Sequence, residues 1–301
     1  MKRIKIKQVD AFTNVPFCGN PAGVITVASG LKEKQMLSIA REMNLSETIF
    51  FFPPTSPDAD LSVRWFTPTT EVNLCGHATI AGFYTLAEEK KYGMEKPGNY
   101  KYRVQTKKGI LKVLVKITKK GYIKITFFIP IPEFSKYEID KSLLKKIFNS
   151  SEDIFDDSLP IMSTGYLIVI PVKRIDALFG VNPNFLSMLK LSEKSGIKVF
   201  TLLSLETVDP ISALHLRCFV PALGVNEDPV TGSAQGEVGV YMVENRLISG
   251  KDGKYSYIGE QGDCLNRPGR VEVSIIEKNN KIDSLSITGS AVTVISGHMY
   301  I

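Results

Sequence analysis

The stretch RWFTPTTEVNLCGHATIAG, Arg64–Gly82, indicates the fold because a similar stretch occurs again later in the chain. It begins with the alternation of a strand, passes through a loop, and continues from Gly76 with the spacing of a helix. A second stretch, RCFVPALGVNEDPVTGSAQG at Arg217–Gly236, repeats the pattern. Its arginine, phenylalanine and proline lie 153 residues after those of the first stretch (64 to 217). The match indicates that the chain contains an internal repeat.

Two further sets of matched residues follow in the same order. After the proline, the second copy is three residues longer and the offset becomes 156 (71 to 227). At this offset Glu71, Gly76, Ala78 and Glu88 match Glu227, Gly232, Ala234 and Glu244. Further on, KGILKV at 108–113 resembles PGRVEV at 268–273. Three ordered matches predict a duplication in which each half has a strand, a loop, a helix that begins with glycine and further strands.

Local patterns place the other elements of the first half. The segment Arg3–Phe12 alternates like a strand, and Leu31–Met43 has helical spacing that ends at Asn44. We expect a helix over Gly76–Tyr92 and mainly strands from Tyr102 to Ile131. The two halves are expected to meet near residue 121.

The composition restricts the class of protein. Lysine and arginine exceed aspartate and glutamate by 37 to 31, but the lysines alternate with apolar residues, so we expect no nucleic-acid partner. No apolar run approaches the roughly 18 residues that span a membrane, and the first residues lack the apolar core of a signal peptide. The four cysteines are widely spaced, which argues against a disulfide framework. These features predict a soluble, cytoplasmic protein that does not bind membranes.

The two glycine-led helix starts, at Gly76 and Gly232, are the first candidate site. A helix start presents unpaired backbone N–H groups and a partial positive charge, and glycine lets a ligand approach the backbone. Two such starts facing each other across a cleft would hold a carboxylate. Ordinary helix caps are the alternative. The repetition, with acidic residues before both starts, favours a binding site.

Three side chains are candidate acid–base groups. His77 directly follows Gly76. Asp228 either initiates a turn before a proline or orients an imidazole, for which His77 is the natural partner. Glu47 opens the apolar strand ETIFFF. It either faces water or, if it lies in a cleft, has its pKa raised by burial and acts as an acid or base.

Cys75 is a less favoured candidate. A symmetric thiol racemase needs a thiol on each side of the substrate carbon, and the repeat matches Cys75 with Thr231. We therefore expect Cys75 to be a buried packing residue. A zinc site at Cys75 and His77 is not expected, because the nearby sequence offers no further ligands.

Four motifs in order resemble those of the PhzF-like family of phenazine-biosynthesis-type isomerases, which are structurally related to diaminopimelate epimerase. They are VDAFTNVPFCGNPAGV (9–24), REMNLSETIFF (41–51), RWFTPTTEVNLCGHAT (64–79) and NEDPVTGSAQG (226–236). The similarity extends to GSAVTVISG at 289–297 and so covers nearly the whole chain.

The resemblance implies an α+β fold of two similar domains, each a mixed or antiparallel sheet curled around a central helix, with the active site in the cleft between them. The expected first domain is 1–120, with the C-terminal strand 286–301 returning to it, and the second is 121–285. Members of the family use no metal or organic cofactor and commonly form homodimers.

The resemblance also implies residue roles. Glu47 would be the base that removes a proton and returns it elsewhere, and His77 and Asp228 would assist proton movement or orient the substrate. A carboxylate would be held by Gly76, Gly232 and Ser233, and Asn20 would line the cleft.

The sequence thus predicts a cofactor-independent isomerase of a small carboxylic acid, possibly a cyclic or amino acid. Two alternatives stay open. One is a racemase or epimerase that uses Cys75, alone or paired with Glu47. The other is a protein that binds small acids without turnover.

Overall fold

The computed structural model describes residues 2–150 and 152–301. It divides into two compact units: the residues up to Phe128 together with Ser286–Ile301, and Ile129–Leu285. Each unit combines a sheet with a few helices, which confirms the predicted α+β class. Among the described residues, we find no helix with the length and apolar character needed to cross a membrane.

The first unit is a sheet curled around one helix. Its helices are α1 (Glu33–Met43) and α2 (Gly76–Glu88). Its strands are β1 (Arg3–Ala11), β2 (Asn20–Ile25), β3 (Glu47–Phe52), β4 (Leu61–Phe66), β5 (Glu71–Val72), β6 (Gly98–Thr106), β7 (Gly109–Ile117), β8 (Ile123–Phe128) and β18 (Ala291–Tyr300), joined by the last residues of β17 (Lys281–Gly289).

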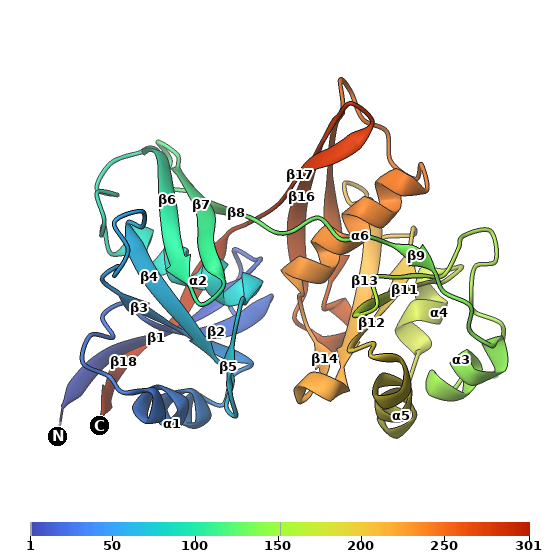
Figure 1. The fold of residues 1–301 in the computed structure, drawn as a ribbon, viewed down its shortest axis with the longest axis horizontal. Coiled ribbons are helices and arrows are strands. Elements are labelled where there is room, and N and C mark those ends of the chain that lie inside the picture. The colour runs from blue at the N-terminus through green and yellow to red at the C-terminus, as the bar shows by residue number, and fades with distance from the viewer. Residues whose placement is uncertain (1, 151) are drawn as a thin grey trace. The chain divides into compact units, whose positions relative to one another are not determined.

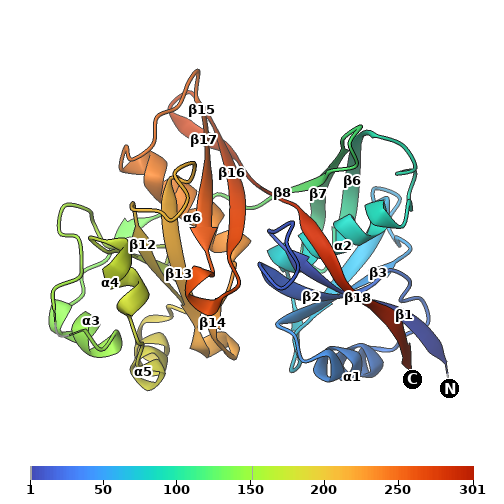
Figure 2. The ribbon, with the colours of Figure 1, turned by 180° about the vertical axis from the view of Figure 1, so that it is seen from behind.

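The order of pairing explains the curl. It runs β18–β1–β2–β3–β4–β6–β7–β8–β17. Because β17 continues almost directly into β18, the chain itself joins the two ends of the sheet. The helix α2 contacts strands at both ends, including β8 and β18, and lies inside the curl (Figure 1). From behind, β18 lies beside β1 (Figure 2).

The composition of α2 suits its enclosed position. Its sequence, GHATIAGFYTLAE, is rich in small and apolar residues and is buried on nearly all sides. A Cβ on Gly82 would lie 2.7 Å from the ring of Phe51, so glycine lets β3 approach the helix closely. The helix is shorter than the predicted Gly76–Tyr92. It ends at Glu88 because Lys90 and Tyr92 take left-handed backbone conformations, with φ of 53° and 52°.

The second unit is built in the same way around α6 (Gly232–Glu244). Its other helices are α3 (Lys141–Ile147), α4 (Ile175–Gly180) and α5 (Phe185–Ser195), with the short η1 (Pro221–Leu223) and η2 (Asp263–Leu265). Its strands are β9 (Ser135–Lys136), β10 (Met162–Ser163), β11 (Leu167–Pro171), β12 (Val199–Ser204), β13 (Leu214–Val220), β14 (Val225–Asp228), β15 (Lys254–Gln261) and β16 (Gly269–Lys278), followed by the first part of β17.

Strand pairing shows the duplication directly. In the first unit β2 and β3 are parallel, β3 and β4 antiparallel, β4 and β6 parallel, and β6 and β7 antiparallel. In the second unit β11 and β12, β12 and β13, β13 and β15, and β15 and β16 repeat this series. The central helices α2 and α6 occupy the same place in the two series, as the sequence repeat predicts.

An arginine–glutamate pair occurs with the same hydrogen-bond arrangement in both units. Arg64 donates two hydrogen bonds of 2.8 Å to the carboxylate of Glu71, and its guanidinium lies 5.0 Å from the ring centre of Phe66. Arg217 donates two bonds of 2.8 Å to Glu227. Each pair closes the loop that leads from a central strand to the central helix of its unit.

The second arginine is the more deeply buried. The side chain of Arg217 is 8% exposed, against 30% for Arg64. It also donates to the main-chain oxygens of Leu178 and Val181, at 3.0 and 2.7 Å. The strand β14 and the end of α4 are therefore held by a single cation.

A buried carboxylate, Glu260, ties β15 to β13 and to the loop before β13. It contacts His215 Nδ1 at 2.9 Å, accepts the N–H groups of Val208 and Asp209 at 2.8 and 2.6 Å, and lies 3.5 Å from Arg270. Burial alone would raise the pKa of Glu260. The contacts with His215, the two N–H groups and Arg270 outweigh that effect and bring the pKa to about 2.

We predict that the two arginine–glutamate pairs contribute unequally to stability. Replacing Glu227 with Gln leaves the charge of buried Arg217 uncompensated and should cost about 3 kcal/mol. The matched change Glu71→Gln leaves the more exposed Arg64, which water can solvate and which still donates to Glu33 at 2.6 Å, and should cost about 1 kcal/mol or less. Urea unfolding of both variants measures the difference. Equal losses would contradict the role given to burial.

We also predict an acid-sensitive contribution from Glu260. Its pKa is lower in the folded chain than its ordinary value of 4.5, so its charged form stabilises the fold above that value. This contribution is lost as the pH falls from about 4.5 toward 2, at up to about 1.4 kcal/mol per pH unit. Urea unfolding at several pH values should show a smaller decline in Glu260→Gln, which is also less stable at pH 7. A variant with the wild-type pH profile would refute this assignment.

Candidate active site

Four side chains of the first unit meet where two strands and the central helix begin. Asn20 is the first residue of β2, and Glu47 is the first residue of β3. Because β2 and β3 are parallel neighbours, both strands start at the same edge of the sheet. Cys75 is the N-cap of α2, and His77 lies in its first turn. We call Asn20, Glu47, Cys75 and His77 the first-unit cluster.

The imidazole of His77 connects the cluster. Its Nε2 lies 3.2 Å from a carboxylate oxygen of Glu47, and its Nδ1 lies 3.1 Å from the amide nitrogen of Asn20. An amide nitrogen only donates, so Nδ1 is the acceptor and Nε2 carries the hydrogen. His77 therefore donates a hydrogen bond to Glu47. The sequence suggests Asp228 as the partner of this imidazole, whereas within the first unit the partner is Glu47.

Burial determines the charge of His77. The residue is 6% exposed, and burial lowers its pKa to about 3. The imidazole is therefore neutral at pH 7, where it serves as a hydrogen-bond donor and is too weakly basic to take up a proton. The side chain of Glu47 is 19% exposed, so it is the member of this pair that solvent reaches more readily.

Cys75 is buried against the imidazole. It is 6% exposed, and its sulfur lies 3.5 Å from Nδ1 and 3.8 Å from Nε2 of His77. The similar distances to both nitrogens fit a sulfur over the ring better than a bond in its plane. The sequence predicts no metal site at Cys75 and His77, because no further ligand lies near them in the chain. The structure adds Glu47, and one ligand atom from each of the three lies within 4.8 Å of the others.

The glycine at the start of α2 has a packing role that the sequence did not reveal. A Cβ on Gly76 would lie 2.9 Å from the ring of Phe127 in β8. The absence of a side chain therefore lets β8 pack against the helix start. The packing of β8 against Gly76 uses the side of the helix. The backbone N–H groups of the first turn point along the helix axis instead.

The second unit has its own group of predicted residues, at the start of α6. Asp228 ends β14, Thr231 is the N-cap, and Gly232 and Ser233 begin the helix. The hydroxyl of Thr231 donates to a carboxylate oxygen of Asp228 at 2.5 Å. With Gln261, these residues form what we call the second-unit cluster.

Gln261 lies outside the motifs that the sequence offers. Its amide nitrogen donates to the main-chain oxygen of Asp228 at 2.9 Å and to the hydroxyl of Thr231 at 3.0 Å, and its amide oxygen accepts the Thr231 N–H at 3.0 Å. The side chain is 1% exposed. It holds the turn before α6 from the end of β15, a strand about thirty residues further along the chain, and no local pattern marks it.

Strand register shows that the two clusters are not chemically equivalent. Thr48 pairs with Phe66, and Phe200 pairs with the equivalent Phe219, so Glu47 corresponds to Val199. By the same reasoning Asp228, which pairs with Cys218, corresponds to Val72, which pairs with Trp65. The carboxylate of each unit thus has an apolar counterpart in the other.

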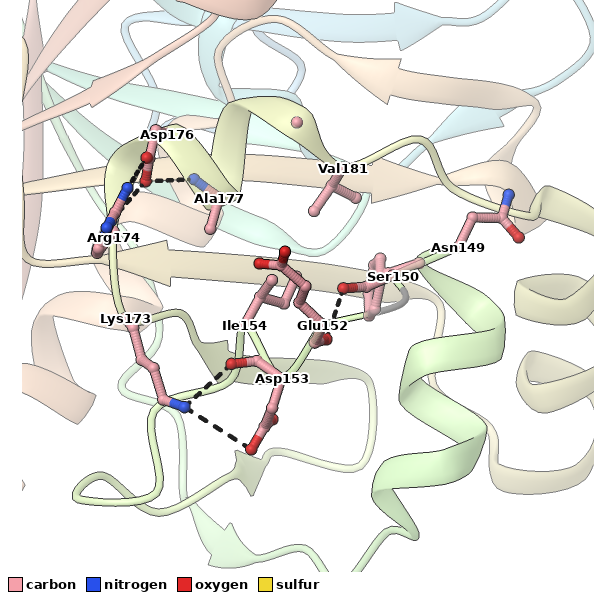
Figure 3. Close-up of a pocket in the computed structure, with 12 residues that line it drawn as sticks. Asn149, Ser150, Glu152, Asp153, Ile154, Lys173, Arg174, Asp176, Ala177 and Val181 are labelled. Atoms are coloured by element: carbon pink, nitrogen blue, oxygen red, sulfur yellow. Dashed lines mark hydrogen bonds and ion pairs between the residues drawn. The ribbon is translucent and has the colours of Figure 1, made fainter.

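A pocket of about 540 Å³ lies elsewhere in the second unit, between the segment after α3 and α4. Figure 3 shows that it is lined by surface ion pairs, Lys173 with Asp153 and Arg174 with Asp176. As described, its lining includes none of the predicted site residues.

Comparisons with known proteins agree with the predicted resemblance. A sequence model of the family described as phenazine biosynthesis-like protein matches residues 9–297. An uncharacterized isomerase of Clostridium acetobutylicum is 35% identical over 99% of both chains. The uncharacterized isomerase YfhB of Bacillus subtilis is 37% identical over 97% of both chains.

Solved structures agree in fold. The crystal structure of a PhzF family phenazine biosynthesis protein of Bacillus anthracis has a TM-score of 0.85 at 34% identity and covers the whole of both chains. A hydroxyproline epimerase from Agrobacterium vitis shares the fold alone, with a TM-score of 0.63 at 12% identity over 99% of this chain and 92% of its own. On the family match and the identities to curated relatives, the chain belongs to the PhzF-like family of phenazine biosynthesis-like proteins.

Proposed function

We propose that the protein is an isomerase that moves a proton within a small carboxylic acid, with Glu47 as the proton carrier. The observation that carries the proposal is the 3.2 Å contact from His77 Nε2 to the Glu47 carboxylate. The imidazole is kept neutral by burial and its other nitrogen faces the amide nitrogen of Asn20. It therefore orients Glu47 without competing for the proton.

The difference between the clusters favours isomerisation over inversion of a stereocentre. Inversion by two opposed bases needs an acid–base group on each face of the carbon. The counterparts of Glu47 and Cys75 are Val199 and Thr231, which do not serve as bases at neutral pH. A single base that removes a proton and returns it to another carbon on the same face shifts a double bond instead. With Asp228 in an orienting or assisting role, this supports proton relocation by Glu47.

Substrate binding is the role proposed for the helix starts. In the described structure, neither N-cap side chain, Cys75 or Thr231, caps its own helix, and neither helix has an acidic residue in its first turn. The N–H groups at Gly76, and those at Gly232 and Ser233, are thus suited to a carboxylate. Asp228, positioned by Thr231 and Gln261, is proposed to orient the substrate or assist the proton.

The names of the relatives support the reaction class but no substrate. Both bacterial relatives are named uncharacterized isomerases. As part of the proposal, the reaction needs no metal or organic cofactor and the protein is a cytoplasmic homodimer, as expected from the family resemblance. Sedimentation equilibrium would test the dimer.

We predict that Glu47→Gln abolishes turnover while preserving binding. The amide keeps the size of the side chain but is not a base, so we expect a loss of at least about 10³-fold. Small cyclic and amino carboxylic acids are first screened by thermal shift. Those that bind are then followed for C–H exchange in D₂O by NMR. Exchange at the wild-type rate in Glu47→Gln would refute the proposal.

The same assay separates Glu47 from a thiol mechanism. We expect Cys75→Ala to keep turnover within about 10-fold of wild type, because its sulfur packs against the imidazole and is not the base. Loss of exchange in Cys75→Ala with activity retained in Glu47→Gln would favour the racemase or epimerase alternative. An acid that binds but exchanges no proton with the wild-type protein would favour the binding protein.

We further predict that Gln261 acts by positioning the turn before α6. Gln261→Leu removes its contacts with Asp228 and Thr231 and should lower kcat/KM by about 10- to 100-fold, the effect of losing a buried clamp of about 1–3 kcal/mol. The matched control is Gln105→Leu, since Gln105 accepts main-chain N–H groups of Thr55 and Ser56 in a first-unit loop. Equal effects of the two variants would contradict this role.

A further inference from the structure

The strand β18 leaves one edge of the first unit's sheet open. Among the described residues it pairs with β1 alone, so its other edge has no strand beside it. Edge strands are commonly short, or carry lysine, glutamate or proline, because these features discourage pairing with another chain. The edge strands β5 and β9 have two residues each. In contrast, β18 has ten residues, AVTVISGHMY, and contains no proline, lysine, arginine, aspartate or glutamate.

One residue pair fixes the direction of the backbone groups along β18. Lys2 and Ile301 exchange both backbone hydrogen bonds, at 2.7 and 2.8 Å. In an antiparallel ladder, such pairs alternate with pairs whose N–H and C=O groups point away from the partner strand. The register continues without a shift from residue 300 back to residue 295. The backbone groups of Ser296, His298 and Tyr300 therefore point to the open edge, and all three residues are exposed.

A second copy of β18, running antiparallel, matches this edge when a two-fold axis passes through His298. Ser296 then pairs with Tyr300 of the second copy, and His298 pairs with its own copy. Each of these residues has its backbone groups directed at the open edge, so each pair exchanges two hydrogen bonds. A small side chain lies opposite the large ring of Tyr300. Any other centre of symmetry would pair fewer of the three residues, because the regular ladder ends at the bulge after residue 295.

The opposite face of β18 is also complementary to itself in this register. It places Gly297 opposite Met299 of the second copy, and Ile295 opposite Ile301. A Cβ on Gly297 would meet nothing within 4 Å, so the space beside it is open for the methionine. Met299 and Ile301 already pack against the apolar cluster between the sheet and α1, whereas Ile295 is 54% exposed. Pairing would extend this apolar cluster across the axis and cover Ile295.

We propose that β18 is the interface of a homodimer, in which the sheets of two first units join edge to edge about a two-fold axis at His298. A strand that pairs antiparallel with its own copy uses the same surface on both chains, so the contact is closed and the assembly stops at two chains. The occupant of the open edge is a second copy of this chain, because both faces of β18 fit their own copies in one register. The inference rests on the homodimer of the proposed function and names the surface that forms it.

Disulfide cross-linking tests the register. In His298→Cys the two new thiols lie directly across the axis, with Cα atoms about 5.5 Å apart, a separation that a disulfide spans. Mild oxidation should therefore give a covalent dimer on a non-reducing gel. In the matched control Ser296→Cys, the two new thiols are offset by four residues along the paired strands, or roughly 13 Å, and should not join. Both positions are exposed, so both variants should fold.

The wild type, oxidised in parallel, accounts for its own partly accessible cysteines, Cys18 and Cys264. Equal cross-linking of His298→Cys and Ser296→Cys would overturn the proposed register. A dimer in solution with no cross-link in His298→Cys would overturn the interface.

A second variant tests the apolar contact without a new covalent bond. Ile295→Asp places a short carboxylate where Ile301 of the second copy packs, and each dimer contains the substitution twice. We expect the dissociation constant of the dimer to rise at least about 100-fold, or about 10-fold for each copy, because a buried, unpaired charge is costly. Sedimentation equilibrium over a range of protein concentrations measures the constant. The matched control is Ile110→Asp in β7, since Ile110 is 45% exposed and lies outside the proposed interface, so its dimer should be unchanged.

The outcomes separate this interface from the proposed function. A dimer that keeps its affinity in Ile295→Asp would overturn the interface and leave the homodimer itself intact. A wild-type protein that stays monomeric at every concentration would overturn both the interface and the homodimer. Neither result bears on Glu47, whose role is decided by the proton-exchange assay with Glu47→Gln.

Discussion

The central constraint in each unit is a helix enclosed by its own sheet. The helix α2 contacts strands at both ends of its curled sheet and is buried on nearly all sides, and most residues of α6 are buried as well. In the first unit, the enclosed helix begins at the edge where β2 and β3 also begin. The first turn of the helix and the first residues of two strands are thus brought together, and the first-unit cluster is a consequence of how the helix is buried.

Duplication gives the molecule two such helix starts. Substitutions have made the side chains around them different. The repeated arginine–glutamate pairs have nearly the same geometry in both units. At the chemical positions the copies diverge, with Glu47 matched by Val199 and Asp228 matched by Val72. The arginine–glutamate pair has been kept in both copies, whereas each candidate carboxylate occurs in one. We propose Glu47 as the proton carrier because His77 contacts it, and Asp228 has the orienting or assisting role.

Much of the fold was predictable from the sequence because its signals are local or repeated. The helix ending at Met43, the glycine-led helix starts and the strands of the first unit follow from periodicity and turn residues. The end of α2 was placed too late because left-handed conformations at Lys90 and Tyr92, which are not glycines, carry no clear sequence signal. The roles of the site residues stay proposals.

The sequence by itself determined the duplication, the positions of both helix starts and the choice of His77 and Asp228 as candidates, because these features lie within one repeated stretch. Only the tertiary structure decided that His77 bonds to Glu47, that Gly76 makes room for Phe127, and that Gln261 holds the turn before α6. Each of these contacts joins residues about 30 to 50 positions apart. Such contacts depend on strand pairing and on the curl of the sheet, and neither is encoded in the spacing of neighbouring residues.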